Sequence, residues 1–197
     1  MQPGENSATM GYLMPATVEV TRGVAVIRVR QPLSPARVRA ALPELPDVAA
    51  LVLHGGERPP PPDAAAPEFK GADFKGMARV APAERRAHLR ELDALRDELA
   101  ALPVPVVAAI DGSAVGDVAE LAMACDHRVL AEGGDLVSMT GGRVLMVRRV
   151  TAAEALRTGM VDQVVARGAV LSAAVELASR CRAARVGRVR RGARSRP

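Results

Sequence analysis

Continuous apolar runs that alternate with helical segments constrain the fold of this chain more than any other feature of its sequence. Strand-like runs occupy residues 49–56, 104–112 and 127–131. They are separated by a helical segment at residues 82–102 and by a loop that leads into a helix at residues 113–126. Uninterrupted apolar strands are typical of parallel sheets covered on both faces, and parallel strands need long crossovers that are usually helices. The alternation therefore predicts an α/β fold with a largely parallel sheet.

Local signals mark further elements at both ends of this pattern. Two β-branched runs flank Arg22 and Gly23, which predicts a hairpin. Thr151 and Glu154 have the spacing of a capping box and predict a short helix, and a last helix is expected over residues 169–184. The segment after residue 112 is expected to be a loop that leads into a helix.

The composition indicates one folded domain. A length of 197 residues suits a single domain, and 49% hydrophobic with 25% charged residues excludes disorder for the bulk of the chain. Tyr12, Phe69 and Phe74 are the only aromatic residues, and two cysteines are too few for a disulfide scaffold. No apolar run reaches the roughly 18 residues of a membrane span, and residues 1–15 lack a secretory pattern. We therefore expect a cytoplasmic protein without membrane association.

The last eighteen residues hold eight arginines and no acidic residue. Without those arginines the formal net charge of +5 becomes −3, so the basic character belongs to this end. Binding of a polyanion, a disordered basic end and divergent sequence of little consequence all stay open. We expect a flexible N-terminus (residues 1–15), a folded domain (16–183) and a disordered arginine-rich tail (184–197), with nucleic acid not the expected partner because no recognised nucleic-acid motif occurs.

The sequence contains few of the general motifs that mark catalytic or metal sites. His54, His88 and His127 lie far apart without metal-ligand spacing, so no metal site is expected, and His88 is expected to be solvated among Glu and Arg. Two glycine-containing junctions, at residues 69–77 and 110–126, each put backbone N–H groups just before a helix. Facing one another, they could offer two donors to one oxygen, which is an oxyanion hole, although glycines before helices usually make plain turns.

Five segments in order resemble the crotonase superfamily, the enoyl-CoA hydratase/isomerase family. They read GVAVIRVRQPLS from residue 23, ALVLHGG from 50, FKGADFKGM from 69, LPVPVVAAIDGSAVGDVAELAMACDHRVLAE from 102 and TAAEALRTGMVDQVV from 151. The resemblance covers about residues 17–168. It implies a crotonase-like (ClpP/crotonase) ββα-spiral core, truncated at the C-terminus where family members carry helices for trimer packing.

Carried over position by position, the resemblance implies catalytic roles for three residues. The backbone N–H of Ala72 matches the first oxyanion donor and that of Asp117 the second, while Glu120 matches the glutamate that helps to hold and activate water in hydratases. Residues implied to bind the CoA thioester are Lys70, Gly71, Asp73 and Gly116. The thioester is a substrate, and no cofactor is implied.

The chain departs from the family at two points. Where family members have three consecutive glycines, this chain has Gly116-Asp117-Val118. A carboxylate beside a developing enolate is unfavourable unless it points away or is protonated. The second catalytic glutamate has Thr140 as its ungapped equivalent, and Asp135, the nearest acid, is off register. A hydroxyl cannot replace a carboxylate as a general acid or base at neutral pH, so one carboxylate suits isomerisation better than hydration.

Three functions therefore compete. The first is an acyl-CoA-binding protein of the enoyl-CoA hydratase/isomerase type, a lyase or isomerase. The second is an inactive homologue that acts as an accessory subunit in a biosynthetic complex, in which Glu120 is merely a helix acid and residues 71–73 a turn. The third is a nucleic-acid-associated protein that acts through the tail. Because missing trimer helices would expose apolar surface, we expect a homo-oligomer or association with another crotonase-like chain.

Overall fold

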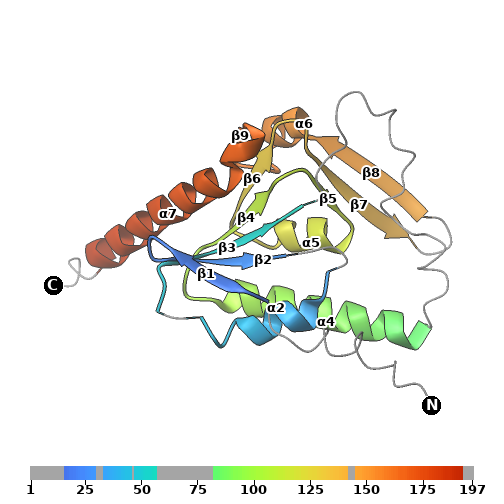
Figure 1. Ribbon diagram of the computed structural model, residues 1–197, viewed down its shortest axis with the longest axis horizontal. Helices are drawn as coiled ribbons and strands as arrows, with labels where there is room; N and C mark the ends of the chain where they lie inside the picture. Colours follow the sequence, from blue (N-terminus) through green and yellow to red (C-terminus); the bar gives the residue numbers. More distant parts are fainter. Residues whose placement is uncertain (1–15, 30–32, 46, 57–81, 142–144, 193–197) are drawn as a thin grey trace, which may run out of the picture.

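The computed structural model describes residues 16–29, 33–45, 47–56, 82–141 and 145–192, which form two sheets with helices around them (Figure 1). The strands are β1 (Val18–Thr21), β2 (Val24–Arg28), β3 (Ala50–Gly55), β4 (Val106–Ile110), β5 (Ser113–Val115), β6 (His127–Ala131), β7 (Asp135–Gly141), β8 (Leu145–Thr151) and β9 (Gln163–Val165). The helices are α2 (Pro35–Ala41), α4 (Pro82–Ala101), α5 (Asp117–Met123), α6 (Ala152–Arg157) and α7 (Val170–Gly192), with a 3₁₀ turn η1 (Arg167–Ala169).

The larger sheet has six strands in the order β1-β2-β3-β4-β6-β9. Every neighbouring pair is parallel except β1 and β2, which form the predicted hairpin. Its turn consists of Arg22 and Gly23, at φ 53° and 76°, and positive φ at both central residues is what a tight hairpin turn requires. The expected α/β fold with a largely parallel sheet is thus confirmed.

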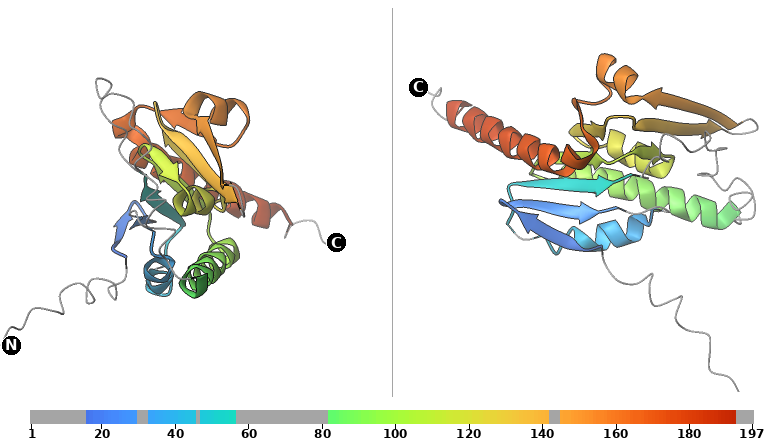
Figure 2. Two further views of the ribbon diagram at one scale, coloured as in Figure 1. Left: turned by 90° about the vertical axis from the view of Figure 1, so that its right-hand side faces the viewer. Right: turned by 45° about the horizontal axis from the view of Figure 1, so that its top comes forward.

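Helices cover both faces of this sheet. On one face, Val26, Val52 and Val107 lie in a buried cluster with Ala174 and Ala178 of α7. The opposite face packs against α2, α4 and α5 (Figure 2). Successive residues of each central strand point to opposite faces of the sheet, and those on both faces are buried and apolar. This explains the continuous apolar runs in the sequence.

The smaller sheet carries β7 between β5 and β8. The loop expected over residues 113–115 is instead the strand β5, which pairs in parallel with residues 135–137 of β7. That expectation was wrong because a three-residue strand has no periodicity of its own and forms through a non-local ladder. β7 and β8 form a long antiparallel hairpin, and α5 packs beside it.

At the C-terminal end, α7 continues as a helix to Gly192, past residue 184 where the tail was expected to begin (Figure 1). Alanine and arginine are strong helix formers and no proline interrupts this stretch, which accounts for the difference. Residues 1–15 and 193–197 lie outside the described residues, so the three domain boundaries stay predictions. Within the described part of the chain, no helix is long and apolar enough to cross a membrane.

An ion-pair cluster holds α4 against α2. Arg39 donates to Glu98 Oε1 at 2.9 Å through Nε and to Glu91 Oε2 at 2.5 Å. These hydrogen bonds raise the pKa of Arg39 and lower that of Glu98. The contact fixes the position of α4, which forms one wall of the site described next.

Candidate active site

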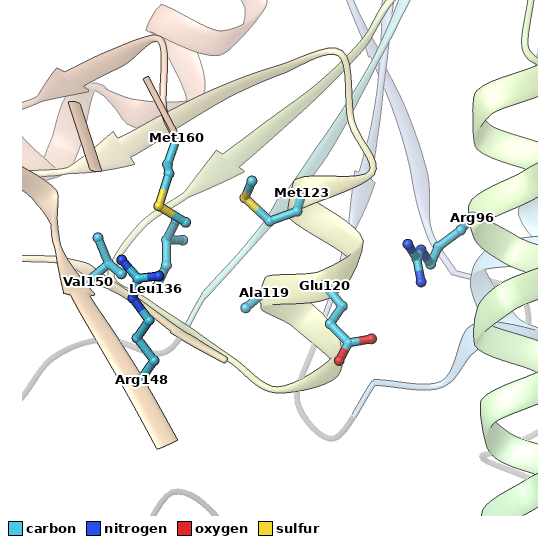
Figure 3. A pocket seen from close by; sticks show the side chains of 8 residues that line it. All are labelled: Arg96, Ala119, Glu120, Met123, Leu136, Arg148, Val150 and Met160. Carbon is cyan, nitrogen blue, oxygen red and sulfur yellow. The ribbon is translucent and has the colours of Figure 1, made fainter. Parts of the chain in front are cut away.

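A cavity of about 360 Å³ lies among α4, α5 and the β7–β8 hairpin (Figure 3). Its apolar lining consists of Ala119, Met123, Leu136, Val150 and Met160, and its charged side chains are Arg96, Glu120 and Arg148. Its volume is at the small end of the roughly 300–1,000 Å³ found for ligand pockets. An apolar hollow with few charged groups is typical of sites that bind small organic molecules.

Glu120 enters this cavity from the first turn of α5 (Figure 3). The start of that helix depends on Gly116, whose φ of 55° and ψ of −123° favour glycine. The N–H of Gly116 donates to Val137 O at 2.9 Å, and its carbonyl accepts from the N–H of Glu120 at 3.0 Å. Gly116 therefore ties the backbone of Glu120 to strand β7.

Asp117, the first residue of α5, turns its carboxylate toward α4. Its Oδ2 accepts a hydrogen bond from His88 Nε2 at 2.6 Å, and both side chains are slightly more than one-third exposed. His88, expected to be solvated, is partly exposed but also bonds to Asp117 across two helices, a contact that separation in the sequence hid. As the first residue of the helix, Asp117 leaves its own backbone N–H without an intrahelical acceptor.

Comparison with known proteins agrees with this architecture. A family model described as Enoyl-CoA hydratase/isomerase matches residues 46–140, a range that includes β3, β4, α5 and β6. The chain belongs to the crotonase superfamily. The predicted crotonase-like fold is thereby confirmed.

Individual crotonase relatives differ in how much of the chain they cover. The human mitochondrial methylglutaconyl-CoA hydratase is 42% identical over 66 residues, which are 34% of this chain and 20% of that protein. The match thus spans about a fifth of that relative's length.

Two solved structures cover far more of the chain. The structure of DspI from Pseudomonas aeruginosa has a TM-score of 0.67 at 25% identity and covers 92% of this chain and 88% of its own. An enoyl-CoA hydratase from Bacillus anthracis has a TM-score of 0.65 at 24% identity, covering 85% and 76% respectively.

The structure brings together only some of the crotonase positions singled out by sequence. Gly116, Asp117 and Glu120 adjoin one another at the start of α5, and Glu120 lines the cavity. The loop positions lie outside the described residues, so their meeting with α5 stays a prediction; they are Lys70, Gly71, Ala72 and Asp73.

Neither of the two positions that the sequence suggested for the family's second glutamate supplies a carboxylate to the cavity. Thr140 lies in β7, where it pairs with Met146. Asp135 pairs with Ser113 at the start of β5, whereas α5 follows the other end of that strand, and it does not line the cavity. Its carboxylate is buried and forms an ion pair with Arg149, whose Nε lies 2.9 Å from Oδ2, while Oδ1 has no hydrogen-bond partner in the described part of the molecule.

Sequence reasoning missed the two cavity arginines. Arg96 lies on the wall formed by α4, and Arg148 lies two residues before Val150 on the cavity-facing side of β8. Neither position lies within the five segments that resemble crotonase motifs. The period-two alternation of β8 would have assigned Arg148 and Val150 to one face, but not to this cavity.

Other chemistries have little support near the site. Burial raises the pKa of the Cys125 thiol to about 12, so it is protonated at neutral pH and is no nucleophile. Among the residues that the structure describes, no group of three or more His, Cys, Asp or Glu side chains could hold a metal ion.

Proposed function

We propose that this chain binds acyl-CoA thioesters and stabilises their enolates, as a protein of the enoyl-CoA hydratase/isomerase type. One observation carries the proposal: Glu120, at the position of the family's first catalytic glutamate, lines a largely apolar cavity next to the start of α5. Family membership supports the kind of substrate, and the cavity supports a short acyl group.

In the proposed mechanism the thioester oxygen accepts hydrogen bonds from the backbone N–H groups of Ala72 and Asp117. The Glu120 carboxylate removes a proton from the α-carbon, and the electron pair of that C–H bond becomes the enolate. In a β,γ-unsaturated thioester, delivery of a proton from Glu120 to the γ-carbon moves the double bond to the α,β position and completes an isomerisation. Exchange of the Glu120 proton with solvent before its return labels the α-carbon in D₂O. Because Thr140 replaces the second glutamate, this single-carboxylate chemistry suits the chain better than addition of water.

His88 supports this arrangement from outside the reacting atoms. Its hydrogen bond draws the Asp117 carboxylate toward α4, so that the backbone N–H of Asp117 rather than its side chain can face the thioester. This answers the main electrostatic objection to an acidic residue in the place of a family glycine.

Enolate formation can be tested without knowing the natural substrate. The protein is incubated with butyryl-CoA in D₂O, and deuterium uptake at the α-carbon is followed by mass spectrometry. We expect uptake with the wild type, and a decrease of about a hundredfold or more in Glu120→Gln, as loss of a general base predicts. Glu132→Gln, which alters an exposed glutamate in the turn after β6, serves as the matched control and retains the rate.

Calorimetry separates the proposal from the accessory-subunit alternative, which the missing second glutamate favours. Acetoacetyl-CoA resembles the enolate and should bind more tightly than free CoA, with the difference lost in Ala72→Pro, which removes a donor N–H. Equal affinity for both ligands in the wild type, together with no deuterium uptake, would refute the enzymatic proposal and favour the accessory role.

A further inference from the structure

Two guanidinium groups border the cavity that holds Glu120. Arg96 approaches from α4 on one side of α5, and Arg148 approaches from β8 on the other (Figure 3). A guanidinium group is a cation that offers several N–H donors in a fixed plane. The charged lining therefore consists of two cations and one carboxylate within an otherwise apolar surface.

Neither arginine is neutralised by a strong ion pair within the described residues. Arg96 contacts Asp93 at 3.5 Å, a pair within one exposed turn of α4 and therefore a weak one. Arg148 has no carboxylate within ion-pair distance among those residues, and no ion pair joins either arginine to Glu120. Their donors are thus available to a ligand.

We infer that the acyl group taken by this cavity carries its own carboxylate, which Arg96 and Arg148 bind. The inference rests on the proposed function, because Glu120 then acts on the carbons next to the thioester while the far end of the acyl group reaches the arginines. Guanidinium groups bind carboxylates through paired, charge-assisted hydrogen bonds. The preferred substrates are therefore CoA thioesters of short dicarboxylic acids.

Size and position favour an acyl carboxylate over the phosphates of CoA as the bound anion. A cavity of about 360 Å³ accommodates a short acyl group rather than a long chain. The long pantetheine arm keeps the CoA phosphates away from the thioester, whereas the far end of a short acyl group stays close to Glu120. The apolar residues between the charged groups suit the methylene carbons of such an acyl group.

Two acyl-CoA ligands that differ in one group provide the test. Glutaryl-CoA and pentanoyl-CoA have the same number of acyl carbons, but the first ends in a carboxylate and the second in a methyl group. Calorimetric titration of the wild type should show glutaryl-CoA binding about tenfold more tightly than pentanoyl-CoA, as expected for a charge-assisted hydrogen bond. This comparison does not depend on the stability of any variant.

Arginine variants assign the preference to the two side chains. Arg148→Met and Arg96→Met keep the apolar stem, and each should lower the affinity for glutaryl-CoA to about that for pentanoyl-CoA, while pentanoyl-CoA binds as before. Arg90→Met, at an exposed position on α4 that does not line the cavity, should keep the wild-type preference.

The outcomes distinguish this inference from the proposed function. If pentanoyl-CoA binds as tightly as glutaryl-CoA, and both bind more tightly than free CoA, the inference is overturned and the proposed function stands. If neither acyl-CoA binds more tightly than free CoA, both fail. If the arginine variants weaken all three ligands equally, the arginines serve the CoA phosphates and the inference is overturned.

Discussion

Replacement of Gly116 by alanine is expected to destabilise the fold and to displace Glu120. At φ 55° and ψ −123°, Gly116 has the conformation of the first central residue of a type II′ turn, which strongly favours glycine. A side chain forced into such a region costs on the order of 1–3 kcal/mol. For a chain of this size a loss of about 2 kcal/mol corresponds to a decrease in melting temperature of about 4–8 °C.

Two other glycines provide graded controls for Gly116→Ala. Gly168 has no positive φ and an added Cβ there would meet nothing within 4 Å, so Gly168→Ala should leave stability nearly unchanged. Gly159, which follows α6, also has open space but a φ of 72°, and Gly159→Ala should cost about 1 kcal/mol because of the left-handed backbone alone. The expected order of destabilisation is Gly168, Gly159, Gly116.

Urea unfolding followed by circular dichroism measures this order, and acetoacetyl-CoA titration below the melting temperature measures the effect on the site. Because Gly116 bonds both to Val137 and to the N–H of Glu120, relief of the strain should move Glu120 and weaken enolate-like ligands more than free CoA. If Gly116→Ala unfolds at the same urea concentration as Gly168→Ala, the start of α5 does not have the described conformation and the reasoning is refuted.

Two further predictions concern histidine–carboxylate pairs. A double-mutant cycle with His88→Gln and Asp117→Asn should give a coupling of about 0.5–1 kcal/mol in the free energy of unfolding, as for partly exposed ion pairs. A coupling near zero would show that the pair does not join α4 to α5. Partial burial on its own raises the pKa of Asp162, but hydrogen bonds from His127 and from the N–H of Arg128 lower it overall. The native state therefore takes up this proton at lower pH than the unfolded chain does. The free energy of unfolding of the wild type should exceed that of Asp162→Asn at pH 7, and the difference should shrink as the pH falls below about 4. A difference that stays constant down to pH 2 would contradict this.

Sequence patterns predicted the fold well because most of its elements carry local signals. The apolar runs are strands buried on both faces, Arg22-Gly23 makes the hairpin turn, and the hydroxyl of Thr151 accepts from the N–H of Glu154 as the capping box requires. The family motifs then supplied the connections between these elements. β5 escaped prediction because its three residues become a strand only through their pairing with β7.

The walls of the site were much harder to predict. Glu120 and Gly116 are found from one contiguous motif. Arg96 on α4 and Arg148 on β8 have β4, β5, α5, β6 and β7 between them in the sequence, and only the fold brings them to one cavity. His88 precedes Asp117 by 29 residues, and the sequence does not distinguish it from the other polar residues of its helix that are exposed to solvent. Contacts of this kind depend on how helices pack, which periodicity does not specify.

The His88–Asp117 pair also links stability to the proposed chemistry. A carboxylate in the first turn of α5 is favourable for the helix, since it complements the partial positive charge at the N-terminus. A thioester enolate bound at the N–H of Asp117 would be stabilised by the same partial positive charge. An unpaired Asp117 carboxylate would therefore compete with the enolate for this stabilisation. The hydrogen bond from His88 on α4 turns that carboxylate aside. Replacement of a family glycine by aspartate is therefore compatible with enolate stabilisation only if His88 accompanies it, and Asp117→Gly should make enolate binding independent of His88.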